Sequence, residues 1–364
     1  MKKRMLTFIM AGVTALGLLA GCGSDSGAAS AGSSESAAAA ETTDAAQTAT
    51  EATTGTATET AAGTATETAA EAATETAAGT ATETAAGTAT AAEDLPALPE
   101  RIKEAGKIVA GVKADFAPFG YVDENGNNAG YDLEIAKKLA EYAFGDPNAV
   151  KFEIVTSSNR IPFLTSNKVD LLLASMAITD ERLEEINFTN IYMSTGHLIL
   201  TDAENENVTS IEDLNSKDAT ILLVAGTTGA TAAEAYCPDA NFLYYETWSE
   251  TLSALKAGRG DAIIHDESVL YETAAADSSV KIIGQAFENT WVAGGVRKDD
   301  AEWLAWLNAA FEKMQKEDFF YTEFQNWFAD WSNVPEGLPR AGMDAITVES
   351  KGFTKETVHE SGKN

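Results

Sequence analysis

The sequence predicts an α/β protein with two lobes, because branched apolar runs alternate with amphipathic stretches of helical period in two successive series. The first series predicts strands at residues 107–112, 150–155 and 169–174 and helices at 133–143, 161–166 and 180–185. A strand, helix, strand succession within one sheet gives parallel strands joined by a right-handed crossover. The first lobe is therefore expected to contain a mostly parallel sheet.

A second, smaller α/β lobe is predicted because this rhythm repeats. It is expected to contain strands at 221–224, 241–245 and 262–264 and helices at 228–236 and 249–257. The chain then closes with strands at 280–283 and 291–296 and helices at 301–316 and 319–331. We expect lobe 1 over residues 96–200 and 288–335, lobe 2 over 201–287, and a surface tail over 336–364, where periodicity ends.

The first residues have the order of a secretory signal. Lys2, Lys3 and Arg4 precede an apolar run that ends at Leu19 and is too short to favour a membrane-spanning helix. The residues Leu19-Ala20-Gly21-Cys22 resemble the bacterial lipobox, whose cysteine is acylated, as with palmitate, and becomes the new N-terminus. We therefore predict a lipoprotein signal peptide at 1–21 and lipidation of Cys22, which would hold the protein on the outer face of the cytoplasmic membrane or in the periplasm. An ordinary cleaved signal with an incidental cysteine is the alternative.

Residues 22–95 are predicted to form a disordered linker, because they are almost entirely Ala, Thr, Glu, Ser and Gly. The unit Gly-Thr-Ala-Thr-Glu-Thr-Ala-Ala starts at Gly55, Gly63 and Gly79. Alanine methyl groups are too small an apolar face for repeats to stack on one another. We interpret the segment as a tether rather than a solenoid.

The overall charge excludes one class of partner. The chain has 25 Lys and Arg against 56 Asp and Glu, a formal net charge of −31, which repels the phosphate backbone of nucleic acids. Cys22 and Cys237 are the two cysteines, and acylation of the first leaves the second without a disulfide partner. The three histidines lie far apart in the sequence, so we expect no metal, no cofactor and no catalytic constellation.

Several motifs occur in the order typical of one family. Gly130-Tyr131-Asp132-Leu133-Glu134-Ile135-Ala136 resembles the signature of the extracellular solute-binding proteins of family 3, which bind amino acids. Further agreement lies at residues 111–121, 159–162, 169–171, 177–189, 226–228 and 258–262. The resemblance implies a type II periplasmic-binding-protein fold, in which two hinge strands, here near 198–202 and 288–296, join the lobes around a ligand. It also implies a monomeric binding protein rather than an enzyme, with an ABC permease and its ATPase as partners.

The resemblance assigns the common part of the ligand site. Arg182 would clamp the α-carboxylate of an amino acid, because a guanidinium can donate two parallel hydrogen bonds, and Asp266 would receive the ammonium. Further expected ligand-binding residues are Ser175, Ala177, Thr227, Thr228 and Phe116. Three alternatives remain: Arg182 pairs with Asp180 or Glu185 at the surface, Thr228 is a helix N-cap, and Phe116 belongs to the core.

Two further basic residues bear on selectivity. Lys113 and Arg160 lie where family members that bind acidic amino acids carry cations directed at the side-chain carboxylate. A neutral ligand would leave such cations unpaired, so glutamate or aspartate is the favoured ligand. The alternatives are a polar neutral amino acid such as glutamine or cystine, or an enzyme similar to cyclohexadienyl dehydratases. A signalling ectodomain would need a transmembrane helix after the domain, where the chain is polar.

Overall fold

The computed structural model describes residues 95–328 and 334–353. The predicted signal peptide, the lipidation site Cys22 and all but the last residue of the linker lie outside the described residues. So do residues 329–331, at the end of the last predicted helix. None of the described helices is long and apolar enough to cross a membrane.

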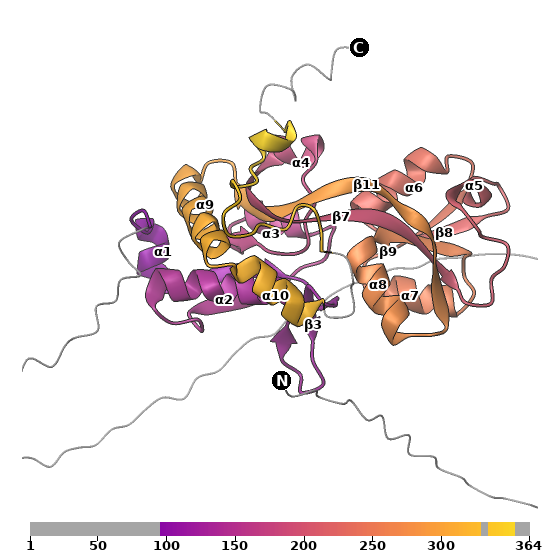
Figure 1. Cartoon of the computed structure of the whole chain (residues 1–364), viewed down its shortest axis with the longest axis horizontal. Coiled ribbons are helices and arrows are strands. Elements are labelled where there is room, and N and C mark those ends of the chain that lie inside the picture. The colour runs from indigo at the N-terminus through magenta and orange to yellow at the C-terminus, as the bar shows by residue number, and fades with distance from the viewer. Residues whose placement is uncertain (1–94, 329–333, 354–364) are drawn as a thin grey trace, which may run out of the picture. The chain divides into compact units, whose positions relative to one another are not determined.

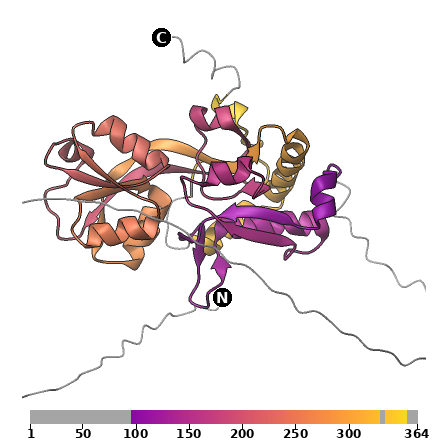
Figure 2. The same cartoon turned by 180° about the vertical axis from the view of Figure 1, so that it is seen from behind.

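The main sheet has eight strands in the order β5-β1-β6-β11-β7-β10-β8-β9. The outer strands of each half pair in parallel, and the three pairs around β11 and β7 are antiparallel. The first half contains β1 (Ile108–Val112), β5 (Val150–Ile154) and β6 (Leu171–Leu172); the second contains β8 (Thr220–Val224), β9 (Asn241–Tyr245) and β10 (Ala262–Asp266). The long strands β7 (Ile186–Asp202) and β11 (Val280–Arg297) run side by side between the two halves (Figure 1 and Figure 2). The two-lobed α/β prediction is confirmed.

Helices cover both faces of the sheet in each lobe, because successive strand residues point to opposite faces. In lobe 1, Leu171 belongs to the core with α2 (Tyr131–Phe144), α9 (Ala301–Lys316) and α10 (Phe319–Trp327), whereas Leu172 packs with α3 (Arg160–Thr165). In lobe 2, Leu222 shares a core with α7 (Trp248–Lys256) and α8 (Glu267–Ala276), whereas Leu223 packs with α5 (Ile211–Leu214) and α6 (Thr228–Tyr236). Short helices α1 (Glu100–Ala105) and α4 (Asp180–Glu185) complete lobe 1.

The connection between the lobes differs from the sequence prediction in two ways. Residues 280–283 and 291–296 belong to one continuous strand, β11, which keeps its pairing with β7 through register shifts between Ile283 and Asn289. β7 already pairs with β10 from His197 onwards. The first crossing therefore lies before His197 and not at residues 198–202.

A small antiparallel sheet, which the sequence did not predict, lies in lobe 1 beside the main sheet. It consists of β2 (Asp115–Phe116), β3 (Gly120–Val122) and β4 (Asn128–Ala129). Strands of two or three residues have too few positions for an alternating pattern to be recognised. The sheet fixes the chain that follows β1, and with it the side chain of Phe116.

The prediction of a surface tail is wrong for residues 336–353, because this segment is anchored in the domain. Leu338 and Ile346 are buried in the core clusters of lobe 1. The Gly337 N–H donates to Ser194 Oγ (2.9 Å), and the Ile191 N–H donates to the Ile346 carbonyl (2.8 Å). The segment, which includes the short 3₁₀ helix η1 (Glu349–Lys351), thus packs along β7.

We expect Leu338→Ala to lower the free energy of unfolding by about 2–4 kcal/mol, because it leaves a cavity in a closed core. Urea unfolding of the full chain, followed by circular dichroism, measures this change. Met343→Ala, in the same segment but 48% exposed, is the matched control and should change stability by less than about 0.5 kcal/mol. Equal stabilities for the two variants would show that the segment is not docked.

Candidate functional site

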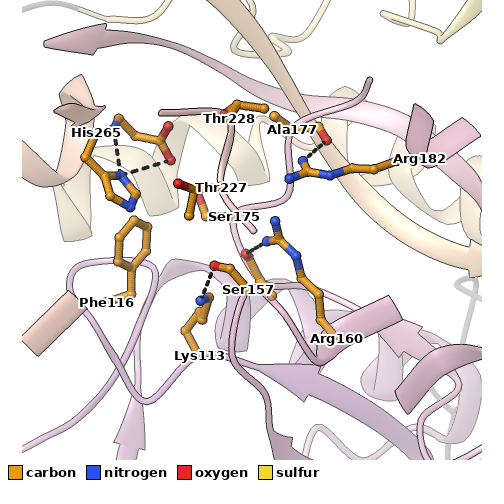
Figure 3. A pocket seen from close by; sticks show the side chains of 12 residues that line it. Lys113, Phe116, Ser157, Arg160, Ser175, Ala177, Arg182, Thr227, Thr228 and His265 are labelled. Carbon is orange, nitrogen blue, oxygen red and sulfur yellow. Dashed lines mark hydrogen bonds and ion pairs between the residues drawn. The ribbon is translucent and has the colours of Figure 1, made fainter. Parts of the chain in front are cut away.

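The nine predicted ligand-binding residues line one cavity between the lobes. They are Lys113, Phe116, Arg160, Ser175, Ala177, Arg182, Thr227, Thr228 and Asp266. Figure 3 shows Lys113 and Arg160 on one side of the cavity and Thr228 and His265 on the other. The cavity measures about 10 Å³, close to the space that one water molecule needs. The lobes are therefore closed on one another around a space too small for an organic ligand, so binding of one requires them to move apart.

The carboxyl ends of the parallel strands bring these residues together. Lys113 follows β1, Thr227 follows β8, and Asp266 is the last residue of β10. Ligands of open α/β sheets bind in the crevice outside these strand ends. The location of the cavity thus follows from the topology of the sheet.

Arg182 lies on α4 and reaches across to the second lobe. Thr179 caps α4 by accepting a hydrogen bond from the Arg182 N–H (3.2 Å). The guanidinium donates to the carbonyl of Ala177 (2.5 Å) and to that of Gly226 in lobe 2 (3.0 Å). Two donors of the planar fork are thus directed into the cleft, and this position favours a role in the cleft over a surface ion pair.

Lys113 and Arg160 are buried cations, 5% and 3% exposed. Lys113 Nζ donates to Ser157 Oγ (2.7 Å), and Arg160 Nη1 donates to the Ala174 carbonyl (2.9 Å). Burial, and then the nearby Arg160 guanidinium, lower the pKa of Lys113 to about 7. Arg160 Nε has no hydrogen-bond partner within the described residues. Both cations are therefore held where a further anion would stabilise them.

Asp266 is the one carboxylate among the described residues that line the cavity. It is 7% exposed, and its Oδ1 lies 3.8 Å from His197 Nε2. The neighbouring His265 is neutral near pH 7, because burial lowers its pKa to about 4. Its Nδ1 accepts a hydrogen bond from the Asp266 N–H (2.7 Å), which fixes the backbone beside the carboxylate.

The two threonines at the start of α6 have different roles. Thr227, not Thr228, is the N-cap: its Oγ1 accepts from the Ala230 N–H (3.2 Å) and donates to the Val224 carbonyl (2.8 Å). Thr228 is the first helical residue, and its hydroxyl lies 3.1 Å from His197 Nε2. The alternative that Thr228 is the N-cap is therefore wrong.

Ser175 is held in an unusual backbone conformation at the cavity wall. Its φ of 43° lies in the left-handed region, and its N–H donates to Asp132 Oδ2 (2.8 Å). Tyr192 donates to the other carboxylate oxygen of Asp132 (2.8 Å), while burial raises the pKa of Asp132 to about 7. Ser175 Oγ has no partner within the part of the chain that the structure describes. Asp132 thus holds the backbone of Ser175 in place, and the Ser175 hydroxyl can form a hydrogen bond with a ligand.

Sequence reasoning missed Ser157 and Ala174 and assigned no ligand contact to His265, although all three line the cavity. Ser157 follows β5, so the rule of strand ends could have found it. Among the described residues, no group of three His, Cys, Asp or Glu is placed to hold a metal ion.

The chain is similar in sequence to several amino-acid-binding proteins. The glutamine-binding protein of Geobacillus stearothermophilus is 36% identical over 189 residues, which cover 52% of this chain and 71% of that protein. The glutamate-binding protein GluB of Corynebacterium efficiens is 27% identical over 248 residues, 65% of this chain and 84% of that protein.

Among solved structures, a cysteine-binding protein from Campylobacter jejuni matches with a TM-score of 0.60 at 36% identity, covering 63% of this chain and 91% of that one. This likeness confirms the predicted type II periplasmic-binding-protein fold. The profile of the bacterial extracellular solute-binding proteins, family 3, matches residues 108–330, more than half of the chain. The chain belongs to the bacterial extracellular solute-binding proteins of family 3.

Proposed function

We propose that the protein is the substrate-binding component of an amino-acid ABC importer, which captures an amino acid between its lobes and delivers it to a membrane permease and its ATPase. Arg182 binds the α-carboxylate and Asp266 receives the ammonium. Thr227, Thr228, Ser175 and the backbone at Ala177 add hydrogen bonds, and Phe116 covers the ligand. Each charged group of an amino acid loses water when the lobes close, so each needs such a partner.

The preferred ligand in this proposal is glutamate or aspartate. The observation that carries this choice is the imbalance of charge among the described residues that line the cavity, which include three basic side chains (Lys113, Arg160 and Arg182) and one carboxylate (Asp266). A zwitterionic ligand with a neutral side chain adds no net charge, whereas an acidic amino acid adds one negative charge. The acidic ligand therefore gives the greater electrostatic complementarity.

Glutamine is the second candidate, because the similar proteins include a glutamine-binding protein as well as a glutamate-binding one. Lys113 already has a hydrogen-bond partner in Ser157, and burial lowers its pKa to about 7, so the neutral amine is accessible near that pH. A neutral amine can lie beside a side-chain amide without an unpaired charge.

Isothermal titration of the purified full chain with each of the common amino acids tests the proposal. Glutamate or aspartate should bind at least about tenfold more tightly than glutamine, a difference of roughly 1.4 kcal/mol. Tighter binding of glutamine or cystine would select the neutral alternative. Binding of none would refute the proposed function.

Glutamate affinity should weaken with increasing pH between about 7 and 8.5, by up to about tenfold per pH unit. Lys113 loses its proton above pH 7 in the ligand-free protein, and a bound side-chain carboxylate raises its pKa again, so binding then takes up a proton. Dissociation constants measured from pH 6 to 8.5 check this slope. Lys113→Gln should remove this pH dependence. A dissociation constant that does not change with pH in the wild type would show that Lys113 does not interact with the side-chain carboxylate of the ligand.

We propose that the protein acts at the outer side of the membrane, to which it is attached by a lipid. A lipid on Cys22 would hold the protein at the membrane, and residues 22–95 would give the binding domain reach towards its permease. Mass spectrometry of the protein purified from membranes tests the anchor, since replacement of Cys22 by serine should remove the acyl mass and release the protein. We further propose that it acts as a monomer.

A further inference from the structure

Residues 246–249, which form the turn after β9 and the first two residues of α7, contact lobe 1 at two places outside the cavity. Glu246 Oε2 accepts a hydrogen bond from Ser158 Oγ (2.6 Å). The Ser249 N–H donates to Asp115 Oδ2 (3.1 Å). Ser158 follows β5 and Asp115 belongs to β2, so both contacts join lobe 2 to lobe 1.

The electrostatics of α7 favour the second contact. The helix has nine residues, and Thr247 and Glu250 form a capping box at its start. Backbone N–H groups of the first turn are partly unpaired and attract negative charge. The carboxylate of Asp115, supplied by the other lobe, therefore acts as an additional cap that exists while the lobes are closed.

Trp248, the first residue of α7, packs against two aromatic rings beside the cavity. It is 6% exposed, and its ring meets Phe116 edge to face at a centroid distance of 6.3 Å and His265 at 5.3 Å. Phe116 and His265 line the cavity, but Trp248 does not. The indole thus supports the cavity wall from outside.

We propose that residues 246–249 form an interlobe clamp that stabilises the closed state and so sets ligand affinity without touching the ligand. The clamp consists of the Glu246–Ser158 bond, the Asp115 cap on α7 and the packing of Trp248. This inference rests on the proposed function. Because its contacts form on closure, loss of the clamp should raise the rate of ligand release more than it lowers the rate of association.

The decisive experiment is a double-mutant cycle on Ser158→Ala and Glu246→Ala in the full chain. Asp115 is left unchanged, because its carboxylate also acts on the Lys113 ammonium in the cavity. Each single variant should weaken binding of the preferred amino acid about fivefold through faster release, and the double variant should be no weaker, because both changes remove one bond. Glu246→Gln, which keeps an acceptor, should recover most of the affinity. Glu206→Ala, which removes an exposed carboxylate from the same lobe, is the control.

Conformation is measured separately by ¹⁹F spectra of protein labelled with 5-fluorotryptophan, with Trp248→Phe used to assign the signal. Wild-type protein saturated with ligand should show Trp248 in one environment, and Glu246→Ala should add a second, open one. Unchanged release rates and spectra in all clamp variants would overturn the inference. If no amino acid binds the wild type, the proposed function fails, and the spectra of the ligand-free protein still test whether the clamp variants shift the Trp248 signal towards the open state.

Discussion

Replacement of Arg182 by alanine should weaken amino-acid binding by at least about 30-fold in affinity. The guanidinium contacts backbone carbonyls from both lobes, so it lies where a ligand carboxylate can replace a carbonyl as the acceptor. Truncation of one partner of a buried charge pair costs about 2–5 kcal/mol. Isothermal titration with the preferred amino acid measures the loss.

Arg182→Lys should bind little better than Arg182→Ala, because a lysine ammonium cannot donate the two parallel hydrogen bonds of the planar guanidinium. Arg259→Ala, which removes an exposed arginine from lobe 2, is the control and should bind as the wild type does. The thermal unfolding temperature of each ligand-free variant shows whether it is folded. Wild-type affinity in a folded Arg182→Ala protein would contradict the assignment of Arg182.

Asp266→Asn should also weaken binding by at least about 30-fold. The change preserves the shape of the side chain but removes the one carboxylate from the described cavity lining, which also contains Lys113, Arg160 and Arg182. The ligand ammonium then loses its charged partner as it is desolvated. The same titrations measure this effect, with Asp218→Asn on the exposed surface of lobe 2 as the control.

This variant also separates a binding protein from an enzyme of the same fold. A dehydratase acting on a prephenate-like acid has no ammonium to bind at Asp266. Turnover of such an acid by the wild type, retained in Asp266→Asn, would therefore favour the enzyme. Loss of amino-acid binding without any turnover in either protein would favour the transport role.

Most of the longer helices and strands could be predicted from the sequence, but helix α8, the small sheet of β2, β3 and β4 and the connection between the lobes could not. Around Gly284 and Glu288 the chain has left-handed φ angles and exposed side chains, so residues 284–290 carry no apolar pattern. The pairing of β11 with β7 nevertheless continues through this stretch. Pairing with β7 therefore keeps residues 284–290 in a strand although their own sequence does not favour one.

The candidate site was predictable because sheet geometry and a family resemblance pointed to the same residues. The carboxyl ends of the predicted parallel strands indicate where a ligand cavity lies, and the resemblance selects Arg182 and Asp266 as residues within it. Neither could reveal that the Arg182 guanidinium contacts Gly226 in the closed form, because that contact depends on the relative position of the lobes. The docked segment at 336–353 was missed for a related reason: isolated anchors such as Leu338 and Ile346 form no periodic pattern.

The position of β11 between β6 and β7 has a consequence for the order of folding. The single β6–β11 pairing joins Leu172 to Gly295, roughly 120 residues away along the chain. The strands of lobe 2 are synthesised between them, and contacts over shorter separations form more rapidly. As the chain emerges during synthesis, the second lobe can therefore fold first, and the lobe that begins earlier in the sequence is completed last.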